Sequence, residues 1–181
     1  MEVLSAFARP ALDWHALAPE LTLLAFGTLI TVVDVVWDER SKRTMPTLAG
    51  LGLLATLLPI LTLAVDGTDR TMFGGAYVVD DFSLVLKALF LISGYVVILM
   101  SVDYIREGDY YENEYYTLML TSLLGMVMMS SSRDLISVFV ALELLSIPAY
   151  MLAAWRKGGP RSNCLLYTSD AADEGLGVDL G

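Results

Sequence analysis

The sequence predicts an all-α membrane protein with about five transmembrane helices. Hydrophobic residues make up 56% of the 181 residues, and the mean hydropathy is +0.61, which is too apolar for a soluble domain of this length. The apolar residues gather in five segments whose lengths approach the roughly 20 residues that a spanning helix needs. None of the five alternates between apolar and polar residues as a membrane β-strand does.

The five expected spans occupy residues 17–37, 45–65, 82–102, 115–130 and 135–155, within a transmembrane region that covers 17–161. Residues 1–16 form an N-terminal segment without the basic start and apolar core of a cleaved signal peptide. The stretch "SSSRD" after the short fourth span leaves room only for a tight reversal, so the fourth and fifth helices should be antiparallel neighbours. Residues 162–181 are polar, acidic and rich in glycine, which is typical of a disordered tail or of non-native sequence.

Basic residues in the loops predict the orientation of the chain, because Lys and Arg are enriched on the cytoplasmic side. The first and third connections and the segment after the fifth span hold seven of them, against three on the other side. The N-terminus is therefore expected outside and the "WRKGGPR" end in the cytoplasm. The seven are Arg40, Lys42, Arg43, Arg106, Arg156, Lys157 and Arg161, and the three are Arg9, Arg70 and Arg133.

The distribution of charge and of metal-binding residue types excludes several function classes. The net charge is −10, but the acids are spread over connecting segments and the tail, so no nucleic-acid partner is expected. The single cysteine, Cys164, permits no internal disulfide, and the single histidine, His15, cannot build a metal site alone. We expect no metal and no cofactor on this chain.

One carboxylic acid, Glu143, interrupts the apolar fifth span "SVFVALELLSIPAYML" near its middle. An acid at the centre of a spanning helix costs about 3 kcal/mol, so such a residue is a functional candidate. Because burial penalises the charged form, a carboxyl there can take up and release protons. We predict that Glu143 is a proton relay; the alternative is a structural acid paired with a neighbouring helix.

Four nearby residues are predicted to support Glu143. Pro148 lacks an N–H, so the carbonyl of Leu144 loses its helical partner and the helix is expected to kink there, which exposes a group that can hold water. Ser146 and Tyr150 lie three and seven positions beyond Glu143, which places the three on one helix face. The alternative for the proline is an ordinary helix kink.

Three other charged residues fall inside the predicted spans. Glu20 and Asp34 lie near the two ends of the first span, where we expect them to reach the headgroups or to cap the helix. Lys87 lies one turn into the third span, and its long stem is expected to lift the ammonium to the outer interface.

Two stretches, "LAPELTLLAFGTLITVVDVVW" and "YYTLMLTSLLGMVMMSSSRDLISVFVALELLSIPAYMLAAWRK", carry a family likeness. They resemble the N-terminal five helices of subunit N (subunit 2), the antiporter-like membrane subunit of the proton-pumping NADH:quinone oxidoreductase, complex I. The acid inside "ALELLSIPAY" is the most specific part. The resemblance covers about 17–161, and the sequence from Asn163 onward departs from the family's pattern.

The resemblance implies a membrane-arm subunit that couples electron transfer from NADH to quinone with proton translocation. Glu143 would correspond to the glutamate of a proton half-channel whose partner is a lysine on a seventh helix, and Lys87 is not that lysine. The five predicted spans do not include a seventh helix, so we expect this chain to be a truncated form of the subunit. NADH, FMN, iron–sulfur clusters and quinone would bind other subunits.

The same resemblance implies partners and a location. The partners would be the other membrane-arm subunits and the lipid bilayer, and the location would be the inner (plasma) membrane of a bacterium, crossed several times. Two alternatives stay open. Related chains occur in multisubunit sodium/proton antiporters and membrane-bound hydrogenases, and a chain with an incomplete channel could be a structural remnant that does not pump.

Overall fold

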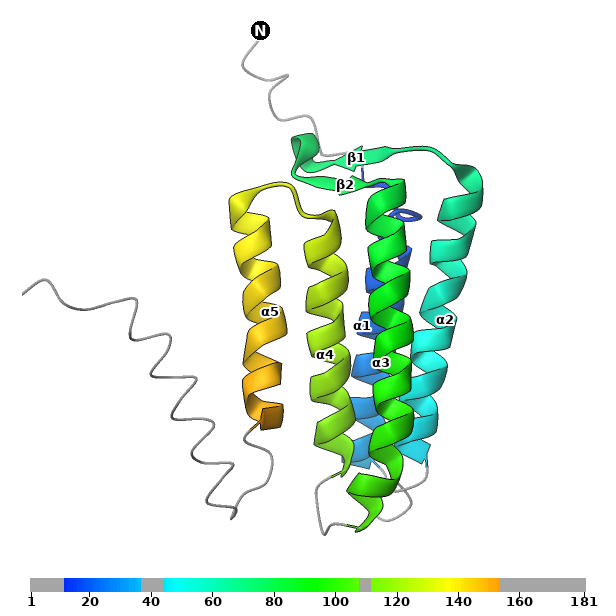
Figure 1. Ribbon diagram of the computed structural model, residues 1–181, viewed down its shortest axis with the longest axis vertical. Coiled ribbons are helices and arrows are strands. Elements are labelled where there is room, and N and C mark those ends of the chain that lie inside the picture. The colour runs from blue at the N-terminus through cyan, green and yellow to red at the C-terminus, as the bar shows by residue number, and fades with distance from the viewer. Residues whose placement is uncertain (1–11, 37–43, 108–111, 154–181) are drawn as a thin grey trace, which may run out of the picture.

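Five long helices run up and down side by side, and a short β-hairpin crosses one end of them (Figure 1). The computed structural model describes residues 12–36, 44–107 and 112–153. The predicted all-α class is confirmed, with the small hairpin as an addition. The elements are α1 (Ala18–Val36), α2 (Thr44–Asp66), β1 (Arg70–Met72), the 3-10 turn η3 (Phe73–Gly75), β2 (Tyr77–Val79), α3 (Asp81–Glu107), α4 (Glu112–Ser131) and α5 (Leu135–Ala153).

Four of these helices are long and apolar enough to cross a membrane by length and composition: α1, α2, residues 81–102 of α3, and α5. α4 is less apolar than these four because it lies inside the bundle, where it contacts each of the other four helices. A helix that faces protein on most sides can carry several hydroxyl side chains, which find hydrogen-bond partners within the helix. Thr121 shows how, since its hydroxyl donates to the carbonyl of Thr117 at 2.8 Å.

Some helix ends differ from the expected spans. α3 continues to Glu107, beyond the expected end at residue 102, and α4 begins at Glu112 rather than at 115. The α4 extension is polar, and the α3 extension is mostly polar, with Tyr104 and the buried Ile105 among its residues. Such residues can continue a helix into the interface after the apolar run has ended. The predicted tail, 162–181, lies outside the described residues, as do residues 1–11 of the N-terminal segment.

The hairpin is a feature that the sequence did not predict. β1 and β2 pair antiparallel, with Arg70 opposite Val79 and Met72 opposite Tyr77. The turn between them needs left-handed backbone at Gly74 and Gly75, whose φ angles are 68° and 95°. Strands of three residues are too short to show an alternating pattern, so no periodicity signalled them.

The hairpin is held to the α3 end and to the α4–α5 reversal by polar contacts. Asp80 caps α3, because its Oδ1 accepts the Ser83 N–H at 2.9 Å while the Ser83 hydroxyl oxygen accepts the Asp80 N–H at 3.0 Å. Arg133, in the reversal, pairs with Asp80 Oδ2 at 2.6 Å and donates its backbone N–H to the carbonyl of Ala76 at 2.8 Å. Asp80 thus joins the end of the hairpin and the start of α3 to the α4–α5 reversal, which lies more than fifty residues further along the chain.

Close backbone approach joins α4 to its antiparallel neighbour α5. A Cβ placed on Gly125 would lie 2.6 Å from the backbone nitrogen of Leu145 and 2.9 Å from the carbonyl oxygen of Ala141. Small residues allow such approach, and in lipid this packing replaces the hydrophobic driving force between helices. The α4–α5 pair therefore depends on a residue without a side chain at position 125.

Gly125→Val should separate α4 from α5, because backbone atoms cannot move aside as a side chain can. We expect a loss of at least about 1–3 kcal/mol in the free energy of unfolding, the usual cost of overpacking. The matched control is Gly27→Val, since no atom lies within 4 Å of a Cβ at that position. Chemical unfolding in detergent micelles measures both; equal stabilities would contradict the close-packing account.

Asp80 should make stability depend on acid pH. The Ser83 N–H, and then Arg133, hold the pKa of Asp80 below its ordinary value, although partial burial opposes them. The stabilisation is therefore complete above the unfolded pKa of about 3.9 and is lost as the pH falls through the lower folded value. In unfolding curves measured from pH 6 downward, Asp80→Asn should remove this component, and an unchanged pH dependence would show that Asp80 does not contribute.

Candidate functional site

Glu143 is the ninth of nineteen residues in α5 and the only charged residue of that helix. α5 packs mainly against α4, and its buried residues are Ala141 and Pro148. With about 3.6 residues per turn, Glu143 lies on the side of α5 nearly opposite Ala141. The Glu143 side chain is accordingly exposed, on the face of α5 that turns away from α4.

The four supporting residues do not all share that face. Tyr150 is 41% exposed and lies two turns from Glu143 on the open side, whereas Pro148 is buried and Leu144 is half-buried on the side of α4. Ser146 lies between these two sides and donates its hydroxyl to the helical carbonyl four residues earlier. The structure therefore places Glu143 and Tyr150 on one side of α5. Pro148 and Leu144, whose carbonyl has no helical partner at the proline, lie on the other side.

The packed side of α5 borders a groove between α1 and α4. The groove has a volume of about 360 Å³, and Leu144 is among its lining residues together with Leu23, Gly27, Thr31, Thr117 and Thr121. Near Pro148, the Ser122 hydroxyl of α4 donates to the carbonyl of Leu145 at 3.2 Å. α5 continues without interruption through Pro148 to Ala153. The α5 segment that the sequence singled out thus borders threonine hydroxyls of α1 and α4 at Leu144 and accepts one hydrogen bond from α4 at Leu145.

Within the part of the chain that the structure describes, the Glu143 carboxylate has no hydrogen-bond or ion-pair partner. Its neighbours on the open face are large apolar side chains, among them Phe139, Val140 and Ile147, each more than half exposed. A carboxyl in such surroundings needs a partner from outside this five-helix unit, because hydrocarbon provides none.

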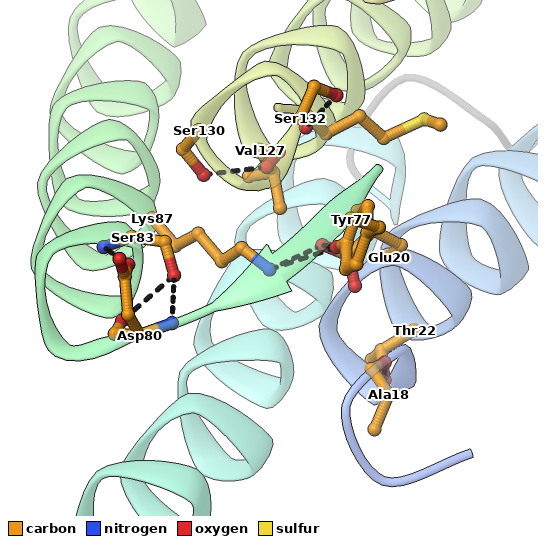
Figure 2. A network of polar contacts seen from close by, with 11 residues as sticks. Ala18, Glu20, Thr22, Tyr77, Asp80, Ser83, Lys87, Val127, Ser130 and Ser132 are labelled. Carbon is orange, nitrogen blue, oxygen red and sulfur yellow. Dashed lines mark hydrogen bonds and ion pairs between the residues drawn. The ribbon is translucent and has the colours of Figure 1, made fainter. Parts of the chain in front are cut away.

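A second group of ionisable residues lies at the hairpin end, and sequence reasoning missed it as a group. Lys87 Nζ lies 2.6 Å from Glu20 Oε1 and 3.1 Å from the Tyr77 hydroxyl, and the Tyr77 hydroxyl donates to the same Glu20 oxygen. Figure 2 shows the three side chains pointing toward one another from α1, β2 and α3. We call these three residues the buried triad.

The expected snorkelling of Glu20 and Lys87 is wrong. Lys87 is 0% exposed and Glu20 is 7% exposed, because the hairpin lies over this end of the helices and places the Tyr77 hydroxyl in contact with both side chains. The two charges neutralise each other inside the bundle instead of reaching the interface. Asp34, at the other end of α1, is half-buried.

The Tyr77 phenol stays protonated in this setting. Burial raises its pKa, the Glu20 carboxylate raises it further, and the Ser131 hydroxyl of α4 lowers it by a smaller amount. The phenol therefore remains an O–H donor to Glu20. One signal could have revealed the pairing: Glu20 is the third residue of α1 and Lys87 the seventh of α3, and both helices start at the same end.

Comparisons with known proteins show which proteins this chain resembles. No family model matches the chain. NADH-quinone oxidoreductase subunit N of Anoxybacillus flavithermus is 36% identical over 147 residues, which cover 80% of this chain and 29% of that protein. The chain is homologous to subunit N. NAD(P)H-quinone oxidoreductase subunit 2 of Gloeobacter violaceus is also 36% identical, over 84% of this chain and 30% of its own length.

A structural comparison agrees with the likeness to subunit N. A chain of respiratory complex I from Thermus thermophilus, solved with bound aureothin, matches with a TM-score of 0.66 and 28% identity. The match covers 85% of this chain and 33% of that chain. The present chain thus spans about a third of the length of the subunit N relatives and of the solved chain that it matches.

Removing one member of the Glu20–Lys87 pair should be more costly than removing both. Lys87→Met leaves a buried carboxylate without its cation, and we expect a loss of about 3–5 kcal/mol in unfolding free energy. Glu20→Gln should cost a similar amount. The double variant should recover part of the loss, because no unpaired charge remains. A double-mutant cycle measured by chemical unfolding tests this, and additive losses would contradict a coupled pair.

Proposed function

We propose that this chain belongs to the membrane arm of an NADH-quinone oxidoreductase and that Glu143 takes up and releases protons there. The observation that carries the proposal is the position of Glu143, at the middle of α5 on its open face. The homology to subunit N supports the choice of complex. In this proposal NADH oxidation and quinone reduction take place on other subunits.

The open face of α5 supports the proposal because an acid in contact with lipid is unfavourable by about 2.5–3.5 kcal/mol. The subunit N relatives are about three times as long as the matched region, so their remaining chain is available to cover this face. We infer that it does so, and that it surrounds the carboxyl with water and polar groups. Tyr150, on the same side of α5, would then border the same space.

The proposed chemistry at Glu143 is electrostatic. A cation that approaches the carboxyl from a covering helix favours the ionised form, and its withdrawal favours the protonated form. A change of shape elsewhere in the complex could thereby load and unload a proton at this position. The groove beside Leu144, with its threonine hydroxyls, offers hydrogen-bonding groups for water on the other side of α5.

The same proposal includes a location and partners. Apolar helices and homology to a membrane subunit indicate a membrane protein. We infer the inner membrane of a bacterium, crossed several times, with the hairpin end outside, and contacts to neighbouring membrane-arm subunits of the complex.

Glu143→Gln tests the assignment in the assembled complex that carries the full-length protein. The change removes the titrating group with little change in volume, so we expect assembly to persist while the number of protons pumped per NADH oxidised falls markedly. Glu143→Asp should keep part of the pumping, because the carboxyl remains but sits one methylene further back.

The matched control is Glu114→Gln, which alters an exposed acid near the start of α4 and should leave pumping unchanged. Proton pumping is followed with a pH-sensitive dye in sealed vesicles, and assembly by native electrophoresis. Normal pumping per electron in an assembled Glu143→Gln complex would remove Glu143 from the proton path.

A further inference from the structure

Two buried polar atoms at the hairpin end have no hydrogen-bond partner in the described part of the chain: Glu20 Oε2 and Ser131 Oγ. Both belong to residues that surround the Tyr77 phenol. Glu20 bonds Tyr77 through its other oxygen, and Ser131 precedes Ser132, whose backbone pairs with Tyr77 in an isolated bridge. The two unpartnered atoms therefore lie on the border of the buried triad.

Leaving such atoms unsatisfied is unfavourable. A buried acceptor without a partner loses its bonds to water and gains none in return, and the loss is greater when the acceptor is charged. Buried polar groups in proteins are therefore almost always bonded to protein or to ordered water. Glu20 Oε2 belongs to a residue that forms an ion pair and is 7% exposed. A buried carboxylate oxygen such as Glu20 Oε2 needs a hydrogen-bond donor.

Apart from Ser131, the neighbouring hydroxyls cannot be that donor, because each already donates to a backbone carbonyl of its own segment. Figure 2 shows these hydroxyls around the triad. They belong to Thr22, Ser83, Ser130 and Ser132. Lys87 and Tyr77 both use Oε1 of Glu20.

We propose that Glu20, Tyr77, Lys87 and Ser131 form a hydrated proton-holding site, with a buried water molecule as its ligand. The water donates one hydrogen to Glu20 Oε2 and shares a hydrogen bond with the Ser131 hydroxyl. This is the usual way in which proteins satisfy buried polar atoms, and it matches the chemistry of both: a carboxylate oxygen accepts only, whereas a hydroxyl donates and accepts.

The contacts within the triad let one proton change place without a change in net charge. The Lys87 ammonium donates to the Tyr77 oxygen, and the Tyr77 O–H donates to Glu20. When the phenol takes a proton from Lys87 and gives its own to Glu20, the result is a neutral amine, an unchanged phenol and a neutral carboxylic acid. The water at Oε2 connects the same carboxyl to Ser131 of α4.

This site is separate from Glu143, which lies at the middle of α5. It contains no residue of α5 and does not depend on the proposed pumping function. Its outer neighbours are Asp80, whose charge acts on Lys87, and Arg133, which pairs with Asp80. A failure of either hypothesis would leave the other standing.

Solid-state NMR of the full chain in lipid bilayers tests for the water. With ¹³C-labelled glutamate and ¹⁵N-labelled lysine, the Glu20 carboxyl is identified by its dipolar coupling to Lys87 Nζ, since these groups are in direct contact at 2.6 Å. Magnetisation transferred from water protons should then reach the Glu20 carboxyl much faster than it reaches the core carbons of Leu91, which is 0% exposed. Equal rates would mean a dry cluster and would overturn the proposal.

Ser131→Ala and Ser130→Ala provide a matched pair of adjacent serines. Ser131→Ala removes one of the two groups that hold the water, so the transfer to Glu20 should be lost or strongly reduced. Ser130→Ala removes a hydroxyl that is already bonded to the Val127 carbonyl at 2.7 Å and should leave the transfer unchanged. If Ser131→Ala also leaves the transfer to Glu20 unchanged, water reaches Glu20 by another route and the proposed water site is wrong.

Tyr77→Phe tests the proton-sharing step. Without the phenol O–H, the Lys87 Nζ protons should exchange with deuterium from the solvent more slowly, although the ion pair with Glu20 remains. The ¹⁵N signal of Lys87 reports both the exchange rate and the persistence of the pair. Unchanged exchange with the pair intact would exclude Tyr77 as the link.

Discussion

Hydrocarbon offers no hydrogen-bond partner, so every polar group inside this bundle needs one from the protein or from buried water. Hydroxyl side chains meet this demand by bonding back to their own helices, as Thr56 does to the carbonyl of Gly52 at 2.7 Å and Ser101 does to that of Val97 at 2.7 Å. Charged groups need a partner of opposite sign. The pair of Glu20 and Lys87 meets that need, and the hairpin that closes over it ties α1, α3 and α4 into one unit.

The two acids inside the helices differ in how far the described residues satisfy them. Glu20 is almost fully buried, with an ammonium and a phenol on one of its oxygens, whereas Glu143 is exposed and has no partner among the described residues. An internal partner makes Glu20 part of the structure of this unit. The carboxyl of Glu143 instead depends on whatever covers the open face of α5, which is why we assign it the proton-relay role.

The long apolar runs were enough to predict the helices, because a helix of about 20 apolar residues matches the thickness of the bilayer core. The position of Glu143 along α5 could also be predicted, but not the side it faces, because the contact with α4 is decided by the glycine at position 125. The buried triad could not be predicted from single positions. Its phenol comes from a three-residue strand without a pattern, and the charge pair forms only because that strand lies across two helix ends.

The environment of Glu143 in the complete protein is the most direct test of this account. A structure of the full-length protein in its membrane complex, at a resolution that shows side chains, would settle what lies against the open face of α5. We expect a further helix over that face, with a polar group or ordered water in hydrogen-bond contact with the Glu143 carboxyl. A carboxyl that faces lipid chains without any partner would contradict the proton-relay assignment.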